Sequence, residues 1–74
     1  MGTVRLESMV AGTVWQLLRQ PGDRVNSGEA VLVVESMKME IPLDAPAAAT
    51  VLEVLVAEGD LVKEGQVLVV LELT

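Results

Sequence analysis

The two halves of the chain repeat one another when the sequence is shifted by 37 residues. Several matched positions are glycines and aspartates, which turn geometry selects and strand composition does not. Self-similarity of this kind indicates a duplicated structural unit and outweighs local propensity. Identical pairs include Thr13-Val14 with Thr50-Val51, Leu18 with Leu55, Gly22-Asp23 with Gly59-Asp60, Val25 with Val62, Gly28 with Gly65, Val33 with Val70, and Glu35 with Glu72.

Each half contains two extended segments separated by two turns. The segments are rich in β-branched residues and lack a helical period, and glycine supplies the positive φ that tight turns need. Short strands with regularly spaced turns predict an all-β sandwich or barrel, and two equal copies predict pseudo-twofold symmetry. The predicted strands cover residues 13–18, 30–35, 50–56 and 67–73, and the predicted turns cover 21–23, 26–28, 58–60 and 63–65.

Length and composition restrict the function further. The 74 residues fit one domain, 1–74, and the absence of Cys and His removes disulfides and the commonest zinc ligands, so we expect no metal site. The net charge of -6 would repel phosphate backbones and anionic lipids, which argues against nucleic acid and membrane partners. No apolar run approaches the roughly 20 residues that span a bilayer. We expect a soluble protein in the cytoplasm.

The midpoint of the repeat carries the residues with chemical potential. Duplication predicts a hairpin between Glu35 and Ile41, at the end of the molecule opposite the two termini, with Lys38 at its tip. An exposed primary amine at such a tip is unhindered and within reach of a modifying enzyme. Two methionines at a surface tip have no evident packing role, and flexible, polarisable side chains suit a surface that meets several partners.

The run Glu35-Ser36-Met37-Lys38-Met39-Glu40-Ile41-Pro42 resembles the attachment site of biotinyl domains, in which the modified lysine stands between two methionines. The resemblance extends over nearly the whole chain: residues 9–14 resemble the family's first strand, and 58–60 and Gly65 resemble its later turns. The short length is similar to that of free-standing biotin/lipoyl attachment proteins. No insertion follows Trp15, so the chain resembles carriers that lack the protruding thumb of the bacterial acetyl-CoA carboxylase subunit.

The resemblance implies a flattened β-barrel, or barrel-sandwich hybrid, of two four-stranded antiparallel sheets. It implies that Lys38 carries covalent biotin attached by a biotin protein ligase, and that Met37 and Met39 take part in recognition of the hairpin. Glu35 and Glu40 are candidates for ligase contact. The expected function is a non-catalytic biotin carboxyl carrier, in which the tethered biotin moves carboxylate from a biotin carboxylase to a carboxyltransferase.

Three alternatives compete with this interpretation. A lipoyl carrier domain would share the fold and the lysine, but it usually has an acidic and a small residue beside that lysine, unlike Met37 and Met39. An unmodified lipoyl-like interaction module would need flanking helical arms. An enzyme would need a nucleophile with a base or a phosphate-binding loop, and the sequence offers neither.

Several other residues have structural interpretations. Trp15 matches Leu52 in the repeat and is expected to face outward or cap an edge. Pro42 and Pro46 are expected to protect a sheet edge, because proline cannot donate to a ladder. Ala49 stands where its repeat mate Gly12 would predict glycine, so a turn of altered shape is expected there. The residues predicted to be buried are Val14, Val25, Val33, Val51, Val62 and Val70.

Overall fold

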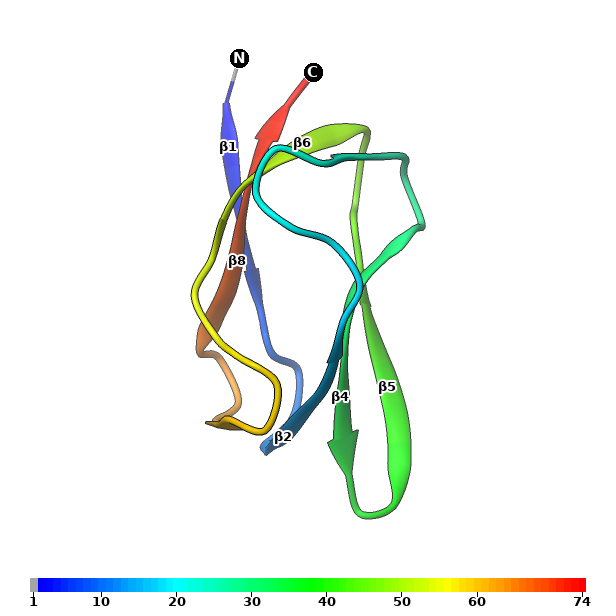
Figure 1. Cartoon of the computed structure of the whole chain (residues 1–74), viewed down its shortest axis with the longest axis vertical. Helices are drawn as coiled ribbons and strands as arrows, with labels where there is room; N and C mark the ends of the chain where they lie inside the picture. Colours follow the sequence, from blue (N-terminus) through cyan, green and yellow to red (C-terminus); the bar gives the residue numbers. More distant parts are fainter. Residues whose placement is uncertain (1) are drawn as a thin grey trace.

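The computed structural model describes residues 2–74, which form eight strands in two sheets, and no helix (Figure 1). Each sheet is antiparallel and has four strands. The two sheets pack into an elongated body of 35 × 17 × 17 Å, with both termini at one end and the hairpin of β4 (Ala30–Ser36) and β5 (Met39–Asp44) at the other. The flattened all-β barrel and the opposed positions of Lys38 and the termini are therefore confirmed.

One sheet has the strand order β1-β8-β6-β3 and the other has the order β5-β4-β2-β7. The strands of the first sheet are β1 (Thr3–Glu7), β8 (Val67–Leu73), β6 (Ala49–Val54) and β3 (Arg24–Val25). The strands of the second are β5 (Met39–Asp44), β4 (Ala30–Ser36), β2 (Gly12–Leu17) and β7 (Leu61–Val62). The first strand lies earlier than predicted: residues 9–14 span a link and the start of β2, because the β1–β8 register shifts after Leu6 and the chain bends at Met9.

A shift of 37 residues carries the strands of one sheet onto the other in the same order, with β1 matching β5 and β8 matching β4. The connecting hydrogen bonds follow the same symmetry. The Gly22 amide donates to the Val51 carbonyl over 2.8 Å, and its mate Gly59 donates to Val14 over the same distance. Both glycines have positive φ, 96° and 92°, which tight turns of this kind require. The repeat seen in the sequence is a structural duplication.

Both halves also contain matching β-bulges. In β2 the register skips Trp15 against β4, and in β6 it skips Leu52 against β8. A bulge leaves one residue unpaired and re-aims its neighbours, and Trp15 and Leu52 are exposed by 44% and 40%. The outward position predicted for Trp15 is confirmed, and its mate shares it.

The core lies between the sheets and is built from paired positions of the repeat. Four of the predicted valines, Val14, Val25, Val51 and Val62, are buried members of the core cluster. Burial of such residues is the main favourable term in folding, because it removes apolar surface from water. Further buried pairs related by the repeat are Val31 with Leu68, Leu32 with Val69, and Val34 with Leu71.

The prediction was correct for Val33 but wrong for Val70. Val33 is buried at 9% exposure, although it is not part of the core cluster, and Val70 is only half-buried. Inward-facing Val34 and Leu71 follow them directly, and alternation along a strand places neighbours on opposite faces. Val33 and Val70 therefore belong to the outer faces, where Val70 pairs with Arg5 and Glu53 on the adjacent strands.

Two further expectations concern edges and turns. Pro42 lies in β5, the edge strand of its sheet, as predicted for a residue that cannot donate to a ladder. Pro46 lies just beyond β5. The expectation of an altered turn at Ala49 was wrong, because Ala49 is buried inside β6 and has no positive φ.

Candidate functional site

The hairpin that carries Lys38 closes by the tightest connection available to two antiparallel strands. Ser36 at the end of β4 pairs with Met39 at the start of β5, so only Met37 and Lys38 form the turn. Their φ angles are 51° and 66°, and these are the two non-glycine residues with positive φ among residues 2–74. A two-residue type I′ turn requires positive φ at both central positions, for which Asn and Gly are preferred. Met37 and Lys38 therefore hold a costly conformation.

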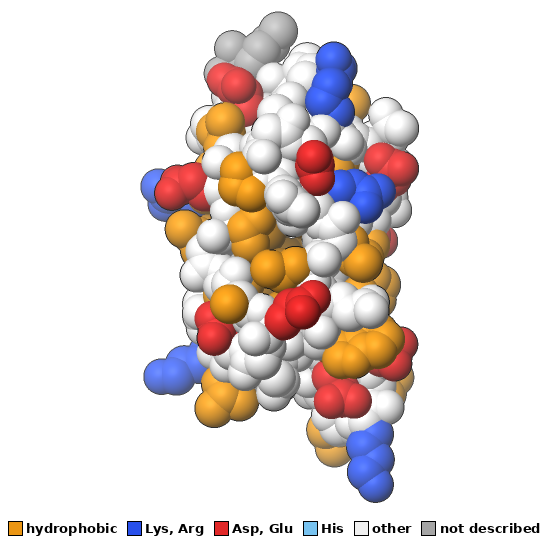
Figure 2. Space-filling model, in the orientation of Figure 1, with side chains coloured by type: hydrophobic (Ala, Val, Ile, Leu, Met, Phe, Trp, Pro, Cys, Tyr) orange, Lys and Arg blue, Asp and Glu red, His pale blue; other side chains and the backbone are white. Residues whose placement is uncertain are grey.

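The side chains of this turn face solvent. Met37 is 92% exposed and Met39 is 65% exposed, and Lys38 is exposed between them. Figure 2 shows a basic side chain at the extreme end of the hairpin, with acidic side chains above it. Within residues 2–74 the one salt bridge joins Arg19 to Glu29 at 3.8 Å, so no described carboxylate holds the Lys38 amine. An exposed, unpaired primary amine fits covalent attachment of an acyl group.

Glu35 and Glu40 face each other directly across the hairpin, one residue pair below the turn. Both are exposed. Like charges directly opposite on antiparallel strands are destabilising, so this pair does not serve the fold. The structure thus brings together Glu35, Met37, Lys38, Met39 and Glu40, as the sequence predicted.

The base of the hairpin is fixed to the strand beside it. The Ser36 hydroxyl donates a hydrogen bond of 2.8 Å to the Ala11 carbonyl. A Cβ on Gly12 would overlap the Glu35 carbonyl oxygen, so only glycine allows β2 to approach β4 here. Sequence reasoning missed Gly12 as a positioning residue, although the mismatch with Ala49 in an otherwise regular repeat was the signal for it.

Lys63, the other lysine of the chain, has a different setting. It lies in the turn between β7 and β8, where its amide donates to the Gln66 side-chain oxygen over 3.0 Å and its carbonyl accepts from the Gln66 amide over 3.0 Å. The positive φ of that turn belongs to Gly65. Lys63 is exposed, but its backbone is not strained and no methionine adjoins it.

Residues 2–74 contain no group of three or more His, Cys, Asp or Glu side chains placed to hold a metal ion. The same residues include no helix long and apolar enough to cross a membrane.

Comparison with known proteins gives relatives of two kinds. The chain is 45% identical over 36 residues to the biotin/lipoyl attachment protein of Bacillus subtilis (strain 168), a match that covers 49% of each chain. It is 45% identical over 40 residues to a probable dihydrolipoyllysine-residue succinyltransferase component of the 2-oxoglutarate dehydrogenase complex, mitochondrial, of Schizosaccharomyces pombe. The second match covers 54% of this chain and 9% of that protein.

Solved structures resemble the whole chain. A single-chain, multi-domain long-chain acyl-CoA carboxylase matches 99% of it with a TM-score of 0.91 and 36% identity, and the match covers 7% of the carboxylase. The urea carboxylase of Kluyveromyces lactis matches 96% of it with a TM-score of 0.90 and 30% identity, over 6% of that enzyme. This chain is therefore similar to one small domain of each enzyme.

The family model described as "Biotin-requiring enzyme", Biotin_lipoyl, matches residues 5–72. This range contains the hairpin, its supporting strands and both halves of the repeat. A domain of this kind carries a covalently attached cofactor, biotin or lipoyl. The chain belongs to the biotin/lipoyl attachment family.

Proposed function

We propose that the chain is a biotin carboxyl carrier, biotinylated on Lys38 by a biotin protein ligase in the cytoplasm. The observation that carries the proposal is the position of Lys38 in a two-residue turn at the far end of the body, exposed and unpaired between two exposed methionines. Residues with strained backbone cluster at functional sites, so the positive φ of Met37 and Lys38 supports a functional role for this turn.

Attachment needs little from the carrier beyond the amine. The Lys38 Nζ would attack the acyl carbon of a biotin activated by adenylation in the ligase, forming an amide bond as AMP leaves and a proton is lost from the nitrogen. The chain itself contains no His or Cys, which supports a substrate role for it. Once bound, biotin would carry carboxylate from a biotin carboxylase to a carboxyltransferase, and the rigid hairpin would hold the base of the tether.

The solved neighbours support biotin over lipoyl. Both are carboxylases, and each matches nearly the whole of this chain at 30% identity or more. The Met37-Lys38-Met39 sequence supports the same choice. A lipoyl carrier is the second candidate, favoured by the 45% identity to the succinyltransferase component.

The surface around Lys38 supports recognition by a cationic partner. Glu35 and Glu40 repel each other across the hairpin, and a Lys or Arg side chain of the ligase placed between them would relieve that repulsion. Met37 and Met39 would provide the apolar part of the contact. The ligase would distinguish this turn from that of Lys63 by four side chains, those of Glu35, Met37, Met39 and Glu40.

The test is competitive modification of the whole chain. Wild type, Lys38→Arg and Lys63→Arg are incubated with ATP, biotin and a biotin ligase, and in parallel with lipoate and a lipoate ligase, then analysed by intact mass and peptide mapping. We expect biotin on Lys38 of the wild type and of Lys63→Arg, and no label on Lys38→Arg, because arginine keeps the charge but offers no amine that can be acylated.

Circular dichroism of Lys38→Arg serves as the folding control, since an unfolded variant would lose labelling trivially. Biotin on Lys63, labelling of folded Lys38→Arg, or exclusive lipoylation would each refute the proposal.

A further inference from the structure

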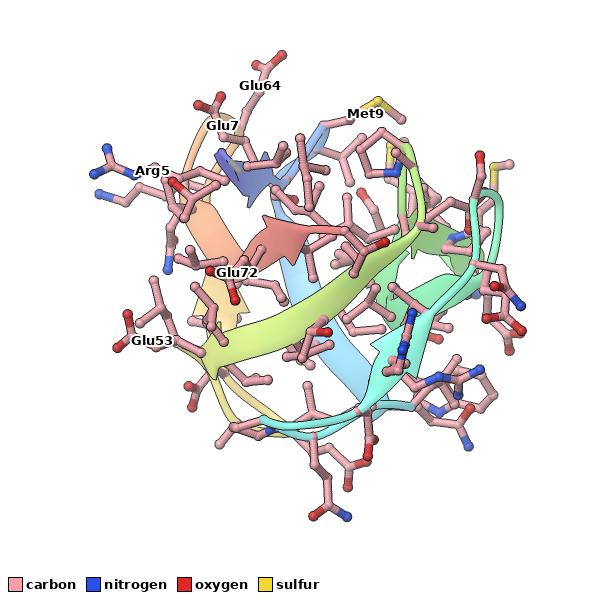
Figure 3. All side chains as sticks on the ribbon, turned by 90° about the horizontal axis from the view of Figure 1, so that it is seen from above. Arg5, Glu7, Met9, Glu53, Glu64 and Glu72 are labelled. Atoms are coloured by element: carbon pink, nitrogen blue, oxygen red, sulfur yellow. The ribbon has the colours of Figure 1, made fainter. Side chains whose placement is uncertain are left out.

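A shallow apolar hollow lies beside the edge strand β5, next to the link between β1 and β2. Met9 and Val10 of the link and Ile41, Pro42 and Leu43 of β5 line it, and it has room for about one water molecule. The Met9 side chain is 68% exposed and projects outward from the link (Figure 3). We call this feature the Met9 hollow.

The Met9 hollow breaks the symmetry of the fold. The 37-residue shift places Pro46 opposite Met9 and Leu6 opposite Leu43. Leu6 is buried at 8% exposure, whereas Leu43 is only half-buried. The half that contains Lys38 therefore leaves this strand position more exposed than the other half does.

The Met9 hollow is within reach of a group attached to Lys38. Met39 and Ile41 are two residues apart on β5 and so project to the same side, and Ile41 lies three residues from Lys38, about 10 Å along the strand. The tether from the Lys38 Cα to the biotin rings contains about ten bonds of about 1.5 Å, which extend to roughly 12 Å. The exposed Met39 side chain lies between Lys38 and Ile41 in the sequence and on the same side of β5 as Ile41.

We infer that the Met9 hollow is a resting site for the biotin attached to Lys38, an inference that rests on the proposed function. A hollow with room for about one water molecule takes one methylene group of the tether, so the rings would lie across its apolar rim, where the polarisable methionine sulfur can contact them. The Ser8 hydroxyl at the hollow already donates to the Val10 carbonyl over 2.6 Å. The Ser8 hydroxyl proton is thus already used within the hollow, and the other lining side chains are apolar, so the ureido ring is expected to stay in water.

The experiment compares the unmodified and the biotinylated full chain by NMR, after intact mass has verified the adduct. Methyl-labelled methionine and backbone amides report on contact. We expect shifts at Met9, Val10 and residues 41–43 in addition to the turn, and nuclear Overhauser effects between the ring protons and the Met9 methyl group. The mates of residues 41–43, residues 4–6 near the termini, are the internal control and should not shift.

Met9→Gln is the matched variant, because it removes the apolar contact at a mostly exposed position. It should be biotinylated normally and should lose the shifts at residues 41–43 while keeping those of the turn. Leu55→Gln, which changes another exposed apolar residue (51% exposed), should leave the whole pattern intact.

The two proposals fail in different ways. A correct biotin adduct with shifts confined to residues 36–40, or shifts at 41–43 that persist in Met9→Gln, overturns the resting site and leaves the carrier function standing. Absence of the biotin adduct overturns both.

Discussion

The two ends of the molecule are built from equivalent strand pairs and differ in how those pairs end. At one end β4 and β5 are joined by Met37 and Lys38; at the other, β8 and β1 run to the chain termini. The same shift that superposes the strands matches Met37 with Thr74 and Lys38 with Met1. The strands are thus common to both ends, and the two-residue turn that contains Lys38 lies at one of them. The duplicated fold is therefore asymmetric at the residues proposed to carry its function.

Joining the two termini, so that β8 and β1 are also connected by a turn, would test this comparison most severely. Leu73 already bonds to Gly2, its amide donating to the Gly2 carbonyl over 2.9 Å. Head-to-tail cyclisation of a Thr74→Met, Met1→Lys chain would place a Met-Lys pair between them. We expect intact mass and peptide mapping to show complete biotinylation of Lys38 and none at position 1, because residues equivalent to Met39 and Glu40 are missing there.

The unsubstituted chain, cyclised in the same way, is the control for folding and for labelling of Lys38. Biotin at position 1 would mean that turn geometry alone is recognised, and that the side chains around Lys38 are dispensable.

Core truncations should affect the two halves equally. Val14 and Val51 are both 1% exposed and related by the repeat. Each change to Ala removes buried methyl groups and leaves a cavity, at a cost on the order of 1–3 kcal/mol in the free energy of unfolding. Urea denaturation measures both. Val70→Ala on the outer face is the control and should cost less than about 1 kcal/mol; a large cost there would contradict the outward orientation.

Gly12 and Ala49 should respond to exchange in different ways. Gly12→Ala forces a methyl group against the Glu35 carbonyl and should cost about 1–3 kcal/mol through overpacking. Ala49→Gly loses one buried methyl group and gains backbone freedom in the unfolded chain, for a cost of about 1 kcal/mol. Thermal denaturation compares the two. Only Gly12→Ala should also slow biotinylation, because only it displaces the strand that carries the hairpin.

The smallest effects on stability are expected at the turn. Met37→Leu keeps size and hydrophobicity and should change the free energy of unfolding by less than about 0.5 kcal/mol. Met37→Asn should stabilise the fold by up to about 1 kcal/mol, since asparagine tolerates positive φ. Both should alter the rate of labelling or the choice between biotin and lipoate ligases. Unchanged kinetics for both variants would leave Met37 without a recognition role.

The sequence predicted those features that depend on turn residues and on the repeat. The Gly-Asp pairs at residues 22–23 and 59–60 located the turns, and duplication then placed Lys38 at the tip opposite the termini. Valines matched by the repeat predicted burial in the core less well. Val33 and Val70 match each other but face outward, and the sequence did not show this because both faces of these strands are rich in valine.

Other features could not be predicted because they arise from contacts between distant segments. The close approach of Gly12 to Glu35 depends on how β2 lies against β4, and the Met9 hollow depends on how the β1–β2 link passes the edge of β5. The first strand, Thr3–Glu7, was missed because the repeat was traced only from Thr13, although its equivalence with β5 continues the same 37-residue shift.

The elongated shape has a mechanical consequence. Both termini leave the same end of a body 35 Å long. A domain or solid support joined to either terminus would therefore hold the molecule at the end opposite Lys38. Rotation of the body about this point of attachment would move Lys38 along an arc whose radius is set by the length of the body. In the proposed carrier, this rotation of the body would add to the reach of the flexible side-chain tether.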